Sequence, residues 1–259
     1  MAEPTLDRIR PTALGELAKW QLHFERALVA SGLDAAATAA VIEGVRARLP
    51  VLLSSAPDPG LAAPHMRAFS VSGVIYVAMY LELASRGQSA AAAWAICEAA
   101  TRARFAAMKG LEKRLATDGM FGWPMRALSR WLSKRSHAAP VGGWVFSFVE
   151  GEPGVFDYGV DYERCAIREM AIANGAGDFA PYICLADVPG SEEFGWGLAR
   201  TETLAQGGRR CDFRFKKGAE TSVKVRLPVA YPGPQPHPGV HPGVTPHPPN
   251  IPERKRSGG

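Results

Sequence analysis

Apolar residues in the first part of the chain recur at the three- and four-residue spacing of helix faces. Over residues 13–32, leucines and alanines follow this spacing, and Gly32 is suited to the turn after the helix end. A second helix is predicted over residues 34–50, with Asp34 as its N-cap and Pro50 as its stop. The chain is therefore predicted to open with two helices joined by a short turn.

Two longer helices, rich in alanine, are predicted over residues 66–87 and 89–110, each ending at a glycine. A shorter amphipathic helix is expected over residues 126–135. The longest apolar run, Val71 to Ala84, is shorter than a membrane span and is interrupted by Glu82. We therefore expect no membrane contact.

The pattern changes near Pro140, where short runs of aromatic and β-branched residues replace the helical spacing. Such runs are typical of strands. A helix ending at Asn174 and Gly175 is expected among them, followed by a short helix or turn over residues 181–190. Strands are expected over residues 142–151, 194–205 and 209–218, a strand or turn over 155–162, and a last strand over 221–228. Gly207 and Gly208 are predicted to form the turn of an antiparallel hairpin.

These elements predict an α+β fold. A helical part, residues 1–139, is expected to pack on a small antiparallel sheet with helices, residues 140–230, within the same domain. Residues 231–259 have proline at nearly every second or third position, so a disordered tail is expected. Its histidines are interpreted as solvated, with metal capture by a flexible arm as the alternative; they are His237, His241 and His247.

The formal net charge of +5 raises the question of nucleic-acid binding. Lysines and arginines are spread among acidic residues, however, and residues 254–256 form the one basic cluster in the sequence. Binding to phosphates needs a concentrated basic surface, so no nucleic-acid partner is expected. The acidic N-terminus is unlike a secretory signal, and four cysteines at irregular spacing are unlike a secreted disulfide framework. We expect a cytoplasmic protein with reduced thiols, and the sequence gives no oligomeric state.

Candidate chemistry is concentrated in two short motifs. Cys184 and Asp187 form a Cys-x-x-Asp motif, and Cys211 is followed directly by Asp212. A thiolate is a nucleophile or a metal ligand, and a nearby carboxylate is an acid/base group. The same residues fit an incomplete zinc site, or two cysteines packed as small apolar side chains. From spacing alone, all three interpretations remain open.

Strand alternation constrains the second motif. Side chains of a strand point to alternate faces, so Cys211, Phe213 and Phe215 are predicted to share one face. Asp212 and Arg214 are predicted to share the other. We expect Cys211 to point inward, and Asp212 to pair with Arg214 or with a helix end.

Residues 156–215 resemble the C-terminal signature of the L-2-amino-thiazoline-4-carboxylic acid hydrolase family. The resemblance consists of an aromatic strand, a helix with a cysteine, Cys-x-x-Asp, Arg-Thr-x-Thr, a glycine turn and Cys-Asp-Phe-Arg. It is carried by Cys165, Cys184, Asp187, Arg200, Thr203, Gly207, Cys211 and Asp212. A second stretch, residues 69–99, resembles the paired helices of the same family, so that the similarity extends over most of residues 40–217.

The resemblance implies hydrolysis of a small cyclic amidine, opening its ring to a carbamyl-cysteine. The implied site has Cys184 as nucleophile, Asp187 as acid/base and Cys211 as a second thiol. Arg200 would bind the substrate carboxylate through its guanidinium, and Thr203 would donate a hydrogen bond to the substrate. No metal is assigned to this site, and no cofactor is implied. The two thiols are expected to converge in one hollow, although they are distant in sequence.

Each assignment has a simpler alternative. Arg200 would form a surface ion pair with Glu202 or with a helix carboxylate, Thr203 would be an ordinary strand residue, and Cys165 would belong to the core. Cys97, in an alanine-rich helix, is expected to pack in the core and to have no chemical role. No histidine lies between Cys165 and Phe215, so a Cys-His pair would need a distant residue; the candidates are His23, His65 and His137, of which His65 is the first to check.

The glycine turn followed by Cys-x-Phe also resembles the vinyl-reductase ligand-binding domain. That resemblance implies a small apolar or tetrapyrrole-like ligand held without turnover, and a zinc ion bound by cysteines and a glutamate. Here Thr203 and Arg200 occupy the positions where that pattern has a cysteine and the glutamate. Zinc is therefore kept as a secondary possibility, beside a scaffold role that would use the proline-rich tail.

Overall fold

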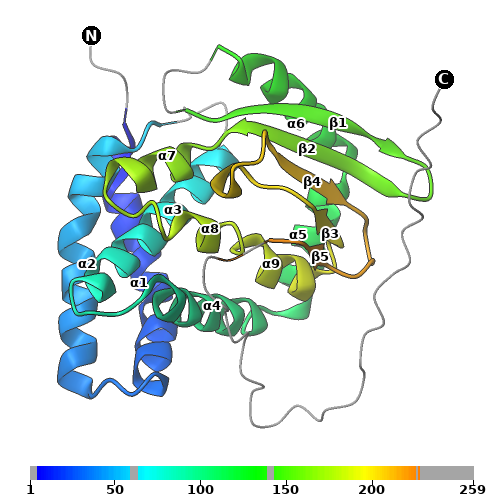
Figure 1. Cartoon of the computed structure of the whole chain (residues 1–259). Coiled ribbons are helices and arrows are strands. Elements are labelled where there is room, and N and C mark those ends of the chain that lie inside the picture. Colours follow the sequence, from blue (N-terminus) through cyan, green and yellow to red (C-terminus); the bar gives the residue numbers. More distant parts are fainter. Residues whose placement is uncertain (1–4, 59–63, 139–142, 226, 228–259) are drawn as a thin grey trace.

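The computed structural model describes residues 5–58, 64–138, 143–225 and 227. Long helices stand on one side of the molecule, a sheet lies on the other, and short helices lie between them (Figure 1). The long helices are α1 (Arg10–Ala30), α2 (Ala35–Ser55), α3 (Pro64–Ala84) and α4 (Ala90–Ala106), preceded by the 3₁₀ turn η1 (Leu6–Ile9). The predicted α+β class is confirmed. The tail and its histidines lie outside the described residues.

Helix α2 begins after the predicted N-cap, but its predicted end at Pro50 is wrong. The Asp34 carboxylate accepts a hydrogen bond from the Ala37 N–H at 2.8 Å, as expected of an N-cap. Pro50, however, lies inside α2, which continues to Ser55. Leu49 and Leu53 are fully buried around this turn, so packing outweighs the missing proline donor.

Helix α3 is the central helix of the helical part. Its segment Met66–Ala84 is long and apolar enough to cross a membrane, and 72% of the window is buried inside the protein. The apolar helix therefore begins before the predicted run Val71–Ala84, and length and composition alone do not exclude a membrane span. Glu82 continues the helix and pairs with Arg48 at 3.0 Å and Arg86 at 2.8 Å. The apolar composition of α3 is explained by burial against neighbouring helices.

Helices α5 (Gly110–Phe121) and α6 (Trp123–Ser136) follow, and α5 was not predicted. Helix α4 ends at Ala106, and Gly110 begins α5 instead of ending α4. Apolar spacing does not reveal α5 because its leucines are exposed, Leu111 at 67%. A polar contact holds it instead: the Thr117 hydroxyl donates to the Phe194 carbonyl at 2.8 Å.

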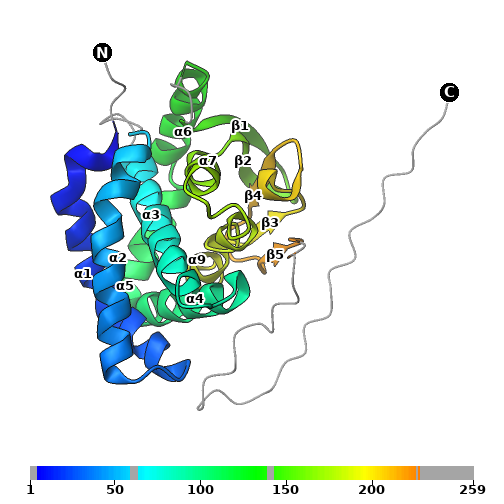
Figure 2. The ribbon, with the colours of Figure 1, turned by 60° about the vertical axis from the view of Figure 1, so that its left-hand side comes forward.

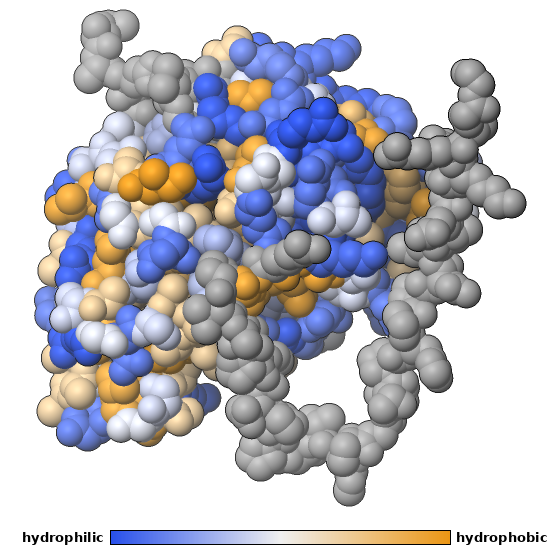
Figure 3. Space-filling view, in the orientation of Figure 1, coloured by the Kyte–Doolittle hydropathy of each residue, from blue (hydrophilic) through white to orange (hydrophobic). Residues whose placement is uncertain are grey.

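The strands form one five-stranded sheet in the order β1-β2-β4-β3-β5. They are β1 (Val145–Glu152), β2 (Phe156–Arg164), β3 (Leu198–Arg200), β4 (Cys211–Phe215) and β5 (Ser222–Val223). The pairing is antiparallel as predicted except for β3 and β5, which are parallel, so the sheet is mixed. The face that is visible over β2 and β4 in Figure 3 is largely hydrophilic.

The predicted two-residue hairpin turn is wrong. Strand β3 ends at Arg200, and a loop containing the 3₁₀ turn η2 (Leu204–Gln206) leads to Cys211. Gly207 adopts φ +81°, which favours glycine, and ends η2. The loop is wide because its residues bond to β4 side chains instead of continuing the ladder.

Short helices connect the two sides of the molecule: α7 (Ala166–Ala173), α8 (Ala180–Ile183) and α9 (Asp187–Phe194). They lie between the long helices and the sheet when the molecule is turned (Figure 2). The ring of Phe179 stacks on Tyr80 of α3 with 4.5 Å between centroids, and Tyr182 stacks on Phe179 at 6.2 Å. This aromatic stack fixes α8, whose end is followed by Cys184.

We predict that Gly44→Ala destabilises the fold. A Cβ at Gly44 would lie 2.3 Å from the carboxyl carbon of Glu82, which two arginines hold in place. Overpacking of this kind costs ~1–3 kcal/mol. Urea unfolding followed by circular dichroism measures the free energy of unfolding.

Gly15→Ala is the matched control, because a Cβ there meets nothing within 4 Å on the exposed side of α1. Replacing this helical glycine is expected to raise the free energy of unfolding by about 0.5–1 kcal/mol. Equal stability of the two variants would contradict the close packing of α2 on α3.

Candidate functional site

The two thiols lie next to each other, as expected, although neither is among the residues that line the recesses described below. Cys184 follows α8, Cys211 is the first residue of β4, and the Cys211 thiol donates a hydrogen bond to the Cys184 sulfur. Both cysteines are free; Cys211 is 5% exposed and Cys184 is half-buried. The sheet and the turn between α8 and α9 therefore meet at a pair of sulfur atoms.

The Arg200 side chain lies at the centre of this meeting point. It ends β3 and is 1% exposed, so of the two alternative partners it pairs with a helix carboxylate, Asp187 of α9, and not with Glu202 at the surface. One guanidinium nitrogen donates to the Cys184 carbonyl, and the other terminal nitrogen donates to the Asp187 carboxylate at 3.3 Å. The guanidinium also lies over the Phe213 ring, 4.7 Å from its centroid. Arg200 therefore ties the α8–α9 turn to the sheet.

Asp187 occupies the first position of α9, where a helix N-terminus favours a carboxylate. Its side chain is 41% exposed and otherwise covered by protein. This desolvation raises the pKa of Asp187 above its usual value, while the charge and the hydrogen bond of Arg200 oppose the rise. Asp187 therefore keeps its proton to a higher pH than an exposed aspartate does.

The paired thiols differ in acidity. The hydrogen bond from Cys211 lowers the pKa of Cys184, and the positive charge of Arg200 lowers it further. The pKa of Cys211 is raised, because its proton is held by Cys184 and because the thiol is buried. The pair is therefore polarised, with the thiolate favoured at Cys184.

Two other residues complete the surroundings of the thiols. Cys165, at the N-cap of α7, packs against the helical core, and burial raises its pKa to about 12. Tyr162 is the register partner of Cys211 on β2, and the thiols at 165 and 211 lie close enough to raise its pKa further. Tyr162 was missed, although alternation from Tyr158 and Val160 places it on the inner face. Cys97 is fully buried in α4, as predicted.

Asp212 points away from the thiols and holds the preceding loop. Its carboxylate accepts from the Thr201 N–H at 2.8 Å, the Glu202 N–H at 2.7 Å and the Thr201 hydroxyl at 2.6 Å. The predicted alternation along β4 is confirmed, but the expected pairing with Arg214 is wrong, because Arg214 pairs with Asp161 at 2.7 Å. Asp212 is therefore a positioning residue for the loop after β3.

Thr203 also lies inside this loop. It is 1% exposed, and its hydroxyl donates to the Gln206 side chain at 3.2 Å. The next residue, Leu204, donates its backbone N–H to the Cys211 sulfur at 3.3 Å. The loop thus covers the thiol pair on one side, and the geometry supports a positioning role for Thr203.

A recess of about 680 Å³ opens beside this loop. Its wall comes from α8, the loop after β3 and the segment after β5; the lining residues are Pro181, Thr201, Glu202, Thr203, Ala205, Gln206, Gly207, Gly208, Lys224 and Leu227. Pro181 lies one helical turn before Cys184, and Leu204 contacts Cys211. The recess therefore lies beside the segments that carry the two thiols, although neither cysteine is among its lining residues.

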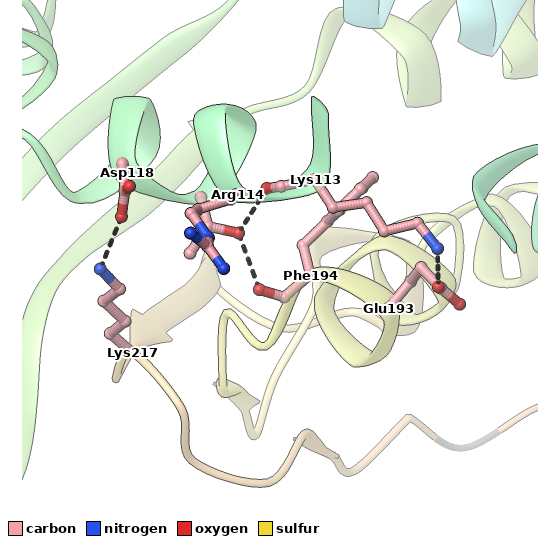
Figure 4. Close-up of a pocket in the computed structure, with 7 residues that line it drawn as sticks. Lys113, Arg114, Asp118, Glu193, Phe194 and Lys217 are labelled. Atoms are coloured by element: carbon pink, nitrogen blue, oxygen red, sulfur yellow. Dashed lines mark hydrogen bonds and ion pairs between the residues drawn. The ribbon is translucent and has the colours of Figure 1, made fainter. Parts of the chain in front are cut away.

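A second recess, of about 380 Å³, lies between α5, α9 and the end of β4 (Figure 4). Lys113 pairs with Glu193 at 2.5 Å, and Lys217 pairs with Asp118 at 2.8 Å. These partly exposed ion pairs connect α5 to its neighbours. No cysteine is among the residues drawn there.

The described histidines lie elsewhere. His23 lies near Arg26 and Arg104, which with burial lower its pKa, and His137 contacts the Ser133 carbonyl. The side chain of His65 lies outside the described residues. Within the described part of the chain, no three His, Cys, Asp or Glu side chains are placed to hold a metal ion.

Comparison with known proteins agrees with the motifs. No curated protein and no solved structure matches the chain. The sequence profile of the L-2-amino-thiazoline-4-carboxylic acid hydrolase family matches residues 69–215, from α3 to the end of β4. This match covers more than half of the chain and includes the paired thiols, Asp187 and Arg200. The chain therefore belongs to the L-2-amino-thiazoline-4-carboxylic acid hydrolase family.

Proposed function

We propose that this protein hydrolyses a small cyclic amidine of the 2-amino-thiazoline carboxylic acid type, with Cys184 as the nucleophile. The polarised pair of Cys184 and Cys211 carries the proposal, because the thiolate is the reactive form of a cysteine. The family membership supports the reaction class.

In the first step, the Cys184 thiolate attacks the amidine carbon of the ring. A carbamyl-cysteine product keeps both nitrogens and has a free thiol, so the bond that breaks joins this carbon to the ring sulfur. Asp187 donates its proton to the departing sulfur, which requires the carboxyl to be protonated, and its raised pKa supports this state. The substrate carbon is then bound to Cys184 and carries two nitrogens.

In the second step, water attacks the same carbon and Cys184 leaves as the thiolate. The Asp187 carboxylate, having lost its proton, takes one from the water and regains its starting state. One water molecule is consumed in total: its oxygen stays on the carbamyl carbon, and the ring sulfur gains a proton. No electron transfer is needed.

In this mechanism Arg200 positions Cys184 and Asp187. Its two terminal nitrogens hold the Cys184 carbonyl and the Asp187 carboxylate, so the nucleophile and the acid keep a fixed relation. Because Arg200 is 1% exposed, its terminal nitrogens are used inside the protein, and the substrate carboxylate needs another cation. Its Nε–H has no hydrogen-bond partner among the described residues.

The alternative function is a binding domain that holds a small ligand without turnover. The residues that stand where the vinyl-reductase pattern binds zinc are Thr203 and Arg200, and both are buried and hydrogen-bonded inside the protein. The acid-base arrangement at Cys184 favours hydrolysis. A binder would retain the ligand unchanged.

Cys184→Ala is predicted to lower ring opening of 2-amino-thiazoline-4-carboxylate on the order of 10³-fold or more, because the nucleophile is removed. Cys211→Ala is predicted to retain part of the activity, because it removes only a hydrogen-bond donor to the nucleophile. The product thiol, released in excess over the enzyme, is measured with a thiol-reactive chromophore and confirmed by mass spectrometry.

Cys97→Ala is the control for loss of a thiol as such, because Cys97 is fully buried in α4 away from the site. It is expected to keep the wild-type turnover. Wild-type turnover in Cys184→Ala, with an unchanged circular dichroism spectrum, would exclude thiol catalysis. Recovery of unchanged substrate with the wild-type protein would favour the binding domain.

Alkylation of Cys184 by iodoacetamide is predicted to have its pH midpoint below 9.0, the ordinary thiol value, because the Cys211 hydrogen bond and Arg200 stabilise the thiolate. In Cys211→Ala the midpoint should rise, since the first of these causes is lost. Peptide mass spectrometry across a pH series measures the modified fraction of Cys184.

Cys211→Ser provides the matched comparison, since a serine hydroxyl also donates a hydrogen bond. Its midpoint should lie below that of Cys211→Ala. A single midpoint shared by the wild type and both variants would show that Cys211 does not influence the acidity of Cys184.

A further inference from the structure

The position of Lys224 places a cation at the recess beside the segments that carry the thiols. Lys224 follows β5, and its backbone N–H donates to the Arg200 carbonyl at 2.9 Å. The preceding residue, Val223, is the register partner of Arg200 in the parallel β3–β5 pair. Lys224 is thus attached to the residue that organises Cys184 and Asp187, although it lies outside the family match.

Of the charged residues that the structure describes on the wall of the recess, Lys224 is the one that could bind an anionic ligand. Among the described residues that line it, Lys224 carries the positive charge and Glu202 the negative one. Glu202 is paired with Arg210 at 3.1 Å, which neutralises it. The exposed Lys224 ammonium forms no ion pair with any residue in the described ranges. An anionic group that enters the recess therefore meets one unpaired cation.

The proposed substrate has an amidine carbon at one end and a carboxylate at the other, and the carboxylate requires a cation away from Cys184. The amidine carbon must reach Cys184, whereas the carboxylate must stay away from the Cys184 thiolate, because like charges repel. Arg200 lies on the thiolate side and is enclosed by the protein. The loop after β3 and Lys224 form part of the wall of the recess. A substrate carboxylate that points away from the thiols would lie at this wall.

We propose that Lys224 binds the carboxylate of the substrate and makes the enzyme selective for small cyclic amidines that carry an acid group. This inference rests on the proposed function and adds the residue that distinguishes acidic from neutral substrates. An ammonium–carboxylate contact strengthens binding without taking part in bond breaking, so its loss affects KM and leaves kcat largely unchanged.

Lys224→Met is the test, with 2-amino-thiazoline-4-carboxylate and its 4-carboxamide as the two probes. The variant is expected to raise KM for the carboxylate about 10- to 100-fold, with less than about a threefold change in kcat. The preference of the wild type for carboxylate over carboxamide should disappear. Lys224→Arg, which keeps the charge, should restore the preference in part.

Lys217→Met is the matched control, because Lys217 follows β4, is exposed and pairs with Asp118 at the other recess. Its KM for the carboxylate should equal that of the wild type. Equal KM values in the wild type and Lys224→Met would overturn the role of Lys224 and leave the proposed hydrolysis intact.

Absence of turnover in the wild type would instead reject the proposed function, and equilibrium binding would then decide the subsite. Calorimetry with the same two probes measures this binding. A carboxylate preference of about tenfold or more in the wild type that is lost in Lys224→Met would support the subsite. Equal binding of the two probes by the wild type would overturn it.

Discussion

The site depends on one buried guanidinium. A charged side chain taken out of water costs several kcal/mol unless it gains compensating contacts. Arg200 gains them from the Cys184 carbonyl, the Asp187 carboxylate and the Phe213 ring, which belong to two different parts of the fold. Removing any of these partners would leave the charge less compensated. The turn that carries Cys184, the proposed nucleophile, is therefore held to the sheet by electrostatics as well as by packing.

The loop after β3 depends on a second polar anchor. Three hydrogen bonds that the Asp212 carboxylate accepts fix Thr201 and Glu202, and the loop then places the Leu204 N–H on the Cys211 sulfur. The adjacent residues Cys211 and Asp212 thus act on opposite sides of β4. Cys211 supports the thiol of Cys184, the proposed nucleophile. Asp212 holds the loop that forms a wall of the recess.

The aromatic stack explains how the helical part positions Cys184, the proposed nucleophile, beside the sheet. Tyr80, Phe179 and Tyr182 connect α3 to α8, so the position of Cys184 follows from the packing of the long helices. The family match, residues 69–215, includes most of α3 as well as the segment that carries Cys184. The lowered pKa of Cys184 and the raised pKa of Asp187 then arise from partners supplied by the sheet and from burial.

The sequence by itself determined what depends on neighbouring residues: the helix faces, the Asp34 cap, the strands, the inward face of Cys211 and the motifs of the family. Side-chain alternation and helical periodicity are local properties, so they can be read from the order of residues. Only the tertiary structure decided that α2 passes Pro50, that Arg200 is buried, that Asp212 bonds to the loop and that Lys224 borders the recess. These outcomes depend on which distant segments pack together, because burial and ion pairing are set by surroundings that the order of residues does not specify.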